Sequence, residues 1–307
     1  MIGTGAFTSL GFQLKDLNNP SVVLTLWVLG GILALSGAFS YAEVGTVISK
    51  SGGEYAFLSK IYNPLIGYLS GWISLTVGFA APIAFSEYFP FGNFNVKWMS
   101  IALVAVITLI HTRSLKLSAE FQNISTLLKV ILIVIIISIG LVLPEHSGNE
   151  IVSSKGYFTE LTSTAFAIAL IYVSYSYSGW NAAAYITEEF ENPLKSLPKA
   201  LIGGTVLVTV LYTLLQYVFL KHVPVNDLAG QLNVGTIATK QMLGEKAGSF
   251  FGLAISLLLI SGISAMVWVG PRVTLSIAKE HRLWSYFQTQ ENGIPKRALW
   301  LQFGISA

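Results

Sequence analysis

Tyr175-Ser176-Tyr177-Ser178-Gly179-Trp180-Asn181 lies in the middle of a segment, residues 161–187, that contains no charged side chain. A helix of this length would reach about 40 Å, which is enough to cross a bilayer with some tilt. Serine, glycine and asparagine form helices less readily than the leucine and alanine around them. Inside a bilayer, an interrupted helix can free its backbone groups only beside a cavity or within protein, and transporters hold substrates at such interruptions. The segment therefore predicts either a broken helix of this kind or a continuous helix whose small residues form a packing face.

Composition places the chain in a membrane. Hydrophobic residues make up 53% of its 307 residues and charged residues only 11%, whereas about 25% of residues are charged in an ordinary soluble domain. Long apolar runs without charge recur along the chain, which is typical of several transmembrane helices. The sequence therefore predicts an all-α polytopic membrane protein.

Composition also excludes several classes of function. The net charge of +3 is spread over the loops, with no basic run of the kind that binds nucleic acid. The chain has no cysteine, which excludes disulfides, thiolate metal sites and a cysteine nucleophile. The four histidines are far apart and lack metal-ligand spacing. We expect no catalytic residue, no metal, no cofactor and no nucleic-acid partner.

Seven membrane spans are expected, joined by short connections and preceded by a short segment over residues 1–14. The spans lie at about residues 22–48, 64–88, 97–112, 121–143, 161–187, 200–220 and 247–275. Residues 234–244 are expected to form a short surface helix in the longest late loop. The short connections leave no room for a soluble domain, so residues 1–307 are expected to form a single transmembrane domain.

The lysines and arginines of the loops set the expected orientation. If residues 1–14 lead out of the cytoplasm, the cytoplasmic loops contain eleven cations: Lys50, Lys60, Arg113, Lys116, Lys195, Lys199, Arg272, Lys279, Arg282, Lys296 and Arg297. The outside loops then contain six: Lys15, Lys97, Lys155, Lys221, Lys240 and Lys246. This excess predicts a multi-pass protein of the plasma membrane with a cytoplasmic N-terminus.

One further cation, Lys129, lies inside an apolar run, Leu127-Leu128-Lys129-Val130-Ile131. An uncompensated lysine near the middle of a bilayer costs about 2.5–3.5 kcal/mol on insertion scales. Its side chain is therefore expected either to snorkel to the cytoplasmic surface or to meet a compensating group inside the bundle, where it would have a function.

A second interruption is expected at the start of the chain, Met1-Ile2-Gly3-Thr4-Gly5-Ala6-Phe7. Glycines on both sides of a threonine let backbone amides approach a ligand, and a helix that begins at Ala6 would present its N-terminal amides to a carboxylate. A flexible chain start is the alternative interpretation. Paired with Ser176–Gly179, the motif gives two interruptions five helices apart, which is typical of an inverted-repeat transporter.

Four sets of motifs resemble those of the amino acid–polyamine–organocation (APC) superfamily of permeases. They match the first helix, the second helix with the loop that follows, the sixth helix and the end of the eighth. In this order they are Ile2–Phe7; Ser40-Tyr41-Ala42-Glu43-Val44-Gly45 with Lys50-Ser51-Gly52-Gly53-Glu54-Tyr55; Tyr177–Asn181 with Thr187-Glu188-Glu189 and Asn192-Pro193; and Gly270-Pro271-Arg272 with Ala278-Lys279. The resemblance covers essentially the whole chain and is strongest to the L-type amino-acid transporters and related branches.

The resemblance implies an inverted-repeat fold of two five-helix repeats, with helices one and six discontinuous at mid-membrane. The first repeat would cover about residues 1–143 and the second about residues 161–307. Almost nothing precedes Ile2, and Ala307 falls within what would be the ninth helix. We therefore expect a fragment truncated at both ends, with an incomplete second repeat and no uptake activity of its own.

The resemblance also implies a substrate site at the two interruptions. Backbone amides would meet the substrate carboxylate and backbone carbonyls its amine, in agreement with the preference of helix N-termini for anions and of carbonyl ends for cations. The amides are those of Thr4, Gly5 and Ala6, and the carbonyls are those of Ile2, Tyr175, Ser176 and Ser178. The Tyr175 side chain would act as a gate over the substrate, unless it is an ordinary buried aromatic residue.

The expected function is secondary active transport of amino acids by alternating access. Lys129 matches a fifth-helix lysine of sodium-independent members, whose ammonium resembles a substitute for a sodium ion. This implies a coupling role for Lys129 and transport without sodium, by proton coupling or exchange. Glu43, Glu188 and Glu189 are expected to be structural or gating residues. The expected partners are the amino acid and the lipid bilayer; a partner subunit is left open.

The sequence leaves three alternatives to this function. A polyamine or organic-cation permease is disfavoured because few acids line the expected site. A channel would conduct ions without saturable uptake. An integral-membrane enzyme would need a converging catalytic cluster, and no cluster of histidine, aspartate and glutamate occurs within the expected spans.

Overall fold

The computed structural model describes residues 2–78, 96–145, 147–149, 151, 155–290 and 293–306. Over these ranges the chain forms helices and no β-strand. In chain order they are α1 (Gly5–Gln13), α2 (Pro20–Val47), α3 (Glu54–Ile61), α4 (Pro64–Ile73), η1 (Ser74–Gly78), α5 (Val96–Arg113), α6 (Leu115–Val142), α7 (Tyr157–Leu161), α8 (Thr164–Tyr177), η3 (Trp180–Glu189), α9 (Pro193–Pro198), η4 (Lys199–Gly203), α10 (Gly204–His222), α11 (Val225–Leu228), α12 (Val234–Glu280), η5 (Arg282–Gln288) and α13 (Lys296–Ser306).

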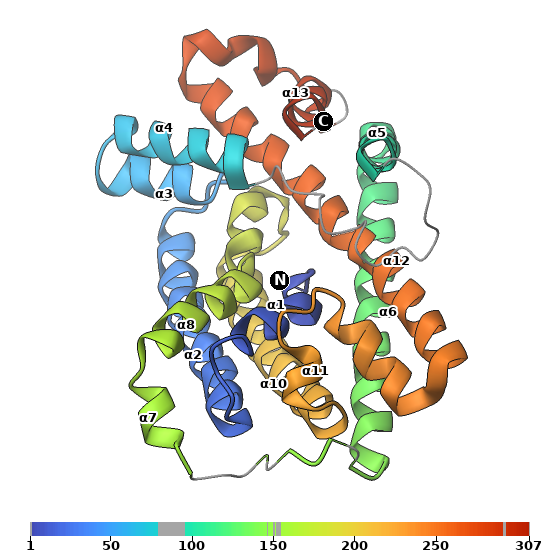
Figure 1. Ribbon diagram of the computed structural model, residues 1–307. Coiled ribbons are helices and arrows are strands. Elements are labelled where there is room, and N and C mark those ends of the chain that lie inside the picture. The colour runs from blue at the N-terminus through green and yellow to red at the C-terminus, as the bar shows by residue number, and fades with distance from the viewer. Residues whose placement is uncertain are drawn as a thin grey trace.

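The short helix α1 lies at the centre of this assembly. Figure 1 shows it beside the N-terminus, surrounded by longer helices, and it contacts α8, α10 and α12. The helices α3, α4 and α13 gather with the last turns of α12 at one end of the molecule, at the top of Figure 1. We call this the α3 end.

Local sequence explains where the long helices begin. The Asn19 side chain accepts a hydrogen bond from the Ser21 amide at 2.9 Å, and α2 starts at the intervening proline. At the start of α8, the Ser163 hydroxyl accepts from the Phe166 amide at 3.2 Å. Each cap satisfies an amide that has no partner within its own helix.

Within the described residues, four helical stretches are long and apolar enough to cross a bilayer, judged by length and composition. They are Pro20–Val47, Lys116–Val142, Pro193–His222 and Val234–Glu280, and Ile101–Arg113 is a shorter apolar helix. The four stretches and this shorter helix together match five of the seven expected spans. With the composition, they show that the chain is an integral, polytopic membrane protein. The expected span 64–88 is described only as far as residue 78, so the rest of it lies outside the described residues.

The remaining expected span, residues 161–187, is a broken helix. The first half, α8, ends at Tyr177, and Ser178 has an extended backbone with φ −53° and ψ 152°. Gly179 follows in the left-handed conformation, with φ 86° and ψ 7°, and η3 then continues the chain. The broken-helix interpretation is therefore correct here and the continuous helix is wrong, because the left-handed conformation that only glycine adopts readily cannot continue a helix.

The helix α2 supports both halves of this broken helix. The glycines of α2 let it approach both halves closely. A β-carbon at Gly30 would lie only 2.3 Å from the Val173 side chain of α8. One placed at Gly37 would lie 2.6 Å from the Trp180 ring of η3. Small residues spaced along one helix face permit this kind of packing in membranes.

Residues 234–244 correct one expectation. They form the first part of α12, before a break at Gly244, where φ is 81° and ψ is 170°. Val234 and Ala238 are fully buried and belong to the main hydrophobic core, so this segment is not a surface helix. It packs against Phe7 of α1, since a β-carbon at Gly235 would meet the Phe7 ring at 2.9 Å.

We predict that Gly179→Ala destabilises the protein, because a left-handed conformation costs an ordinary residue about 1–2 kcal/mol. The matched control is Gly203→Ala, a helical position where an added β-carbon has nothing within 4 Å. That change should be neutral or stabilise by up to about 1 kcal/mol. Thermal unfolding in detergent measures both variants. Equal melting temperatures for Gly179→Ala and the unchanged protein would show that residue 179 is not at the break.

Candidate functional site

The two interruptions lie against each other. A β-carbon placed on Gly5 would come within 2.7 Å of the Ser176 hydroxyl oxygen and 2.8 Å of the Ser176 Cα. One turn along α1, the hydroxyl oxygens of Ser9 and Ser176 are 2.7 Å apart. Residues 167 positions apart in the sequence are thereby held together. The start of α1 and the end of α8 are thus in contact, which brings candidate substrate residues of both segments close together.

The first interruption presents free backbone amides. Thr4 is the N-cap residue of α1, and no side chain caps this helix. The amides of Gly5 and Ala6 lie in the first helical turn, where an α-helix has no acceptor of its own for them. Such a helix N-terminus attracts an anion through these donors and through the helix dipole.

Side chains from α10 hold this first turn in place. Gln216 donates its side-chain amide to the Ala6 carbonyl at 2.8 Å, and both groups are buried. The Tyr212 hydroxyl hydrogen-bonds the backbone of Gly3. Sequence analysis missed Gln216, although one signal was present: it is a neutral polar residue in an otherwise apolar membrane span, where such residues commonly have a specific partner.

Lys129 reaches the first interruption directly. Its ammonium Nζ donates to the Ile2 carbonyl oxygen at 2.6 Å, and the residue is only 5% exposed. The snorkelling alternative is therefore wrong in this structure, because the charge has a partner inside the bundle. A β-carbon at Gly262 of α12 would be 3.9 Å from this Nζ, so the ammonium lies between α6, α12 and the start of the chain.

This contact bears on the expected role of Ile2. Its carbonyl, expected to meet the substrate amine, is already an acceptor for Lys129. A carbonyl oxygen has two lone pairs, so it can accept a second hydrogen bond. The Ile2 carbonyl can therefore accept a hydrogen bond from a substrate amine only while it also accepts the one from Lys129.

The second interruption places its two tyrosines differently. Tyr177 is buried, and its ring centroid lies 6.0 Å from that of Trp27 and 5.2 Å from that of Tyr212. Tyr175 is 65% exposed, so it is not an ordinary buried aromatic residue. Its backbone carbonyl accepts a hydrogen bond from the Ser178 amide at 3.0 Å, which closes the last turn before the break. The Tyr175 side chain is therefore not held in the core.

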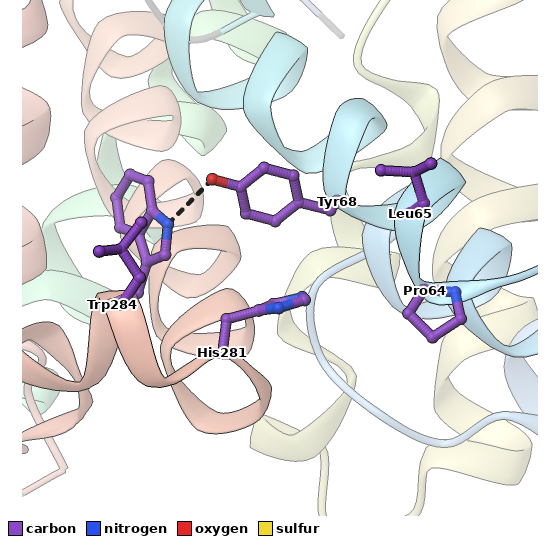
Figure 2. Close-up of a pocket in the computed structure, with 6 residues that line it drawn as sticks. Pro64, Leu65, Tyr68, His281 and Trp284 are labelled. Carbon is purple, nitrogen blue, oxygen red and sulfur yellow. Dashed lines mark hydrogen bonds between the residues drawn. The ribbon is translucent and has the colours of Figure 1, made fainter.

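A cavity of about 370 Å³ lies elsewhere, at the α3 end. Figure 2 shows Tyr68 of α4 and Trp284 of η5 on its walls, joined by a hydrogen bond of 3.1 Å from the indole nitrogen to the tyrosine hydroxyl. The other lining residues are Pro64, Leu65, His281 and Leu283. This lining is largely apolar and offers no pair of opposite charges for a zwitterion, so we place the candidate site at the interruptions instead.

Comparisons with known proteins find related sequences. The family model described as amino acid permease matches residues 1–307. The chain is 35% identical over 241 residues to b(0,+)-type amino acid transporter 1 of Homo sapiens, covering 74% of the chain and 50% of the relative. It is 28% identical over 298 residues to the serine/threonine exchanger SteT of Bacillus subtilis, covering 92% and 66%. It is 27% identical over 307 residues to Asc-type amino acid transporter 1 of Mus musculus, covering 93% and 57%. The chain thus spans between half and two thirds of the length of these relatives.

We predict that Gly5→Val abolishes binding at this site. Its β-carbon would collide with the Ser176 backbone and push the two interruptions apart; overpacking of this kind costs about 1–3 kcal/mol. The control is Gly204→Val, where an added β-carbon has nothing within 4 Å. Ligand-induced thermal shift in detergent compares the two variants. A Gly5→Val protein that binds as well as the control would show that the site has been placed wrongly.

Proposed function

The chain belongs to the amino acid permease family, and we propose that it moves amino acids across a membrane by alternating access. It is a permease and not an enzyme. The observation that carries the proposal is the contact between the two interruptions, which brings amide donors and backbone carbonyls to one place inside the bundle. An amino acid carries a carboxylate and an ammonium group on one carbon, and such a site offers a partner to each.

The proposed substrate contacts follow from this arrangement. The carboxylate would meet the amides of Thr4, Gly5 and Ala6 at the start of α1. The ammonium group would meet carbonyls at the end of α8, with the Ile2 carbonyl shared with Lys129. These carbonyls are those of Tyr175, Ser176 and Ser178. The exposed Tyr175 side chain is proposed as the gate, because it is attached at the break and is not held in the core.

The family fold is proposed to be the inverted repeat of two five-helix units, with repeats over about residues 1–143 and 161–307. Support comes from the interruptions, one before α1 and one after α8, which would occupy equivalent places in the two repeats. We further propose that the α3 end faces the cytoplasm in a plasma membrane. The excess of lysine and arginine in the loops assigned to that side supports this orientation.

Lys129 is proposed as the coupling residue. Its ammonium binds the Ile2 carbonyl just before α1 begins, so loss of its proton would remove the positive charge that this carbonyl compensates. A change in protonation would thereby favour one arrangement of the interruption over another, because the two arrangements interact differently with the ammonium. A resident positive charge at this place also supports transport that needs no sodium ion, by proton coupling or exchange.

The runner-up substrate class is a polyamine or other organic cation. A dication needs acidic partners to offset its second charge. Among the side chains described in contact with the two interruptions, the polar ones are serine, threonine, glutamine, tyrosine and lysine. This set favours a zwitterion over a dication.

A binding screen tests the proposed function. The complete protein in detergent is heated with each common amino acid and, in parallel, with spermidine and putrescine. A ligand at a hundred times its dissociation constant stabilises the folded protein by about 2.7 kcal/mol. We expect at least one amino acid to raise the melting temperature and the polyamines to have no effect. Stabilisation by polyamines alone would replace the proposal with the runner-up.

We predict that Lys129→Ala removes most uptake and its pH response, whereas Lys116→Ala on the same helix changes neither. The Lys116 side chain is 86% exposed and provides the matched control. Uptake by the complete protein in proteoliposomes, measured across pH and with sodium replaced by choline, is the test. Strict sodium dependence would contradict the coupling role. So would a Lys129→Ala protein with the uptake and pH profile of the unchanged protein.

A further inference from the structure

The carboxylate of Glu54 is the acceptor at the centre of a second polar cluster. It lies in the first turn of α3, away from the proposed substrate contacts. The Tyr41 hydroxyl of α2 donates to it at 3.1 Å. Two more donors come from η3: the Asn181 side-chain amide and the Tyr185 hydroxyl. One side chain therefore joins α2, α3 and the part of the broken helix that follows the break.

A carboxylate is well suited to the centre of this cluster. A carboxylate accepts several hydrogen bonds at once, and all three donors to Glu54 are neutral. The amides in the first turn of α3 favour a negative charge at this position. A glutamine here would carry its own two N–H donors into a group of donors, so it cannot reproduce the arrangement.

The loop before Glu54 lies flat against η3. The amides of Gly52 and Gly53 donate to the carbonyls of Tyr185 and Ala184, at 3.1 and 3.3 Å. A β-carbon at Gly53 would come within 2.6 Å of the Tyr185 ring, so a larger residue would push the loop away. Backbone and side-chain contacts thus hold the same short stretch of η3.

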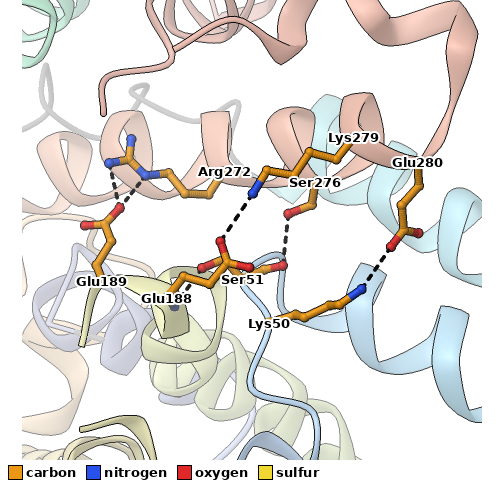
Figure 3. A network of polar contacts seen from close by, with 8 residues as sticks. All are labelled: Lys50, Ser51, Glu188, Glu189, Arg272, Ser276, Lys279 and Glu280. Carbon is orange, nitrogen blue, oxygen red and sulfur yellow. Dashed lines mark hydrogen bonds and ion pairs between the residues drawn. The ribbon is translucent and has the colours of Figure 1, made fainter. Parts of the chain in front are cut away.

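Ion pairs extend this attachment to α12. Arg272 donates to one carboxylate oxygen of Glu189 through two nitrogens, both at 2.7 Å, and its side chain is only 6% exposed. The Lys279 ammonium of α12 lies 3.3 Å from the carboxylate of Glu188, which precedes Glu189 on η3 (Figure 3). Glu188 and Glu189, expected to be structural or gating residues, are therefore located where α12 meets the end of the broken helix.

The loop is joined to α12 as well. The Ser276 hydroxyl donates to the Ser51 carbonyl at 2.9 Å, and the Ser51 hydroxyl accepts from the Glu188 amide at 2.9 Å. Lys50 lies 3.6 Å from Glu280 at the last turn of α12. Figure 3 shows these contacts as one continuous group between the loop, η3 and α12.

We propose that Glu54 is a positioning residue: by holding Asn181 and Tyr185 it keeps η3 locked against the α2–α3 loop, and together with the ion pairs to α12 it forms a latch that closes the substrate path at the α3 end. The proposal rests on the proposed transport function. Asn181 comes two residues after Gly179, so a shift of η3 would be passed directly to the break and its carbonyls. Substrate leaves toward the α3 end only after η3 parts from Glu54.

The absence of cysteine from the chain makes a direct test possible. Thr187 lies on η3 between the break and the ion pairs, and its side chain is fully buried. In a Thr187→Cys protein, the rate of labelling by a charged maleimide, read at residue 187 by mass spectrometry, reports opening of the latch. We expect Glu54→Gln to raise this rate at least tenfold. Glu191→Gln makes the same chemical change at an exposed carboxylate nearby and should leave the rate unchanged.

Size-exclusion chromatography shows whether each variant is folded. A second, milder variant keeps the test valid if Glu54→Gln does not fold. Tyr185→Phe removes one donor to Glu54 and keeps the ring, so it should raise the labelling rate by a smaller factor. Combined with Glu54→Gln it should add little, because both changes remove the same contact. Labelling rates equal to the Glu191→Gln control in both folded variants would overturn the proposal.

The labelling rate needs no substrate, so the two proposals can fail separately. If Glu54→Gln exposes residue 187 but no amino acid binds or is transported, the latch is supported and the proposed function is wrong. If amino acids are transported while labelling and uptake are the same in Glu54→Gln and the control, the proposed function is supported and the latch is wrong.

Discussion

Backbone groups that leave a helix inside a bilayer need another partner, because no water is present to satisfy them. This constraint explains why a lysine lies deep in the molecule. At the first interruption, Lys129 binds the Ile2 carbonyl, and Gln216 binds the Ala6 carbonyl in the first turn of α1. The amides at the start of α1 are the ones that we propose for the substrate. A buried lysine and a backbone carbonyl outside a helix are each unfavourable alone in a bilayer. Here the Lys129 ammonium and the Ile2 carbonyl satisfy each other.

The broken helix connects the site with the α3 end. Its first half, α8, touches α1 through Ser176, and its second half, η3, touches Glu54 and the ion pairs of α12. The helix α2 packs against both halves through closely approaching glycines. The two halves therefore have different attachments: α8 belongs to the core around the site, whereas η3 belongs to the polar cluster. A change at Ser178–Gly179 can move one half relative to the other, as transporters that alternate between two arrangements require.

The charge of Lys129 and the charges of the glutamates at the α3 end have different kinds of partner. Lys129 is compensated by a backbone carbonyl within the bundle, so its charge is tied to the geometry of the first interruption. Glu54, Glu188 and Glu189 are compensated by side chains of other elements at the α3 end. Separating those elements would leave partly buried charges without partners, which is costly unless water enters. Opening at this end and hydration of the path are therefore expected to occur together.

The sequence by itself determined the features that depend on neighbouring residues. Low charge and long apolar runs established the membrane class. Poor helix formers at Ser176–Gly179 left a broken helix and a continuous helix as alternatives, and the structure has the break at Ser178–Gly179. The apolar surroundings of Lys129 showed that this charge needed either a route to the surface or a buried partner. Each of these inferences follows from local propensity or from the cost of burying a group, and both can be read from a short stretch of chain.

Only the tertiary structure decided which distant residues meet. It placed Ser9 against Ser176 and Lys129 against Ile2, 167 and 127 positions apart. It buried one face of residues 234–244, a segment expected at the surface, because α1 supplies Phe7 as a packing partner. It also buried Tyr177 and left Tyr175 exposed. Local pattern does not settle such outcomes, since they depend on which helix faces are brought together when the whole chain packs.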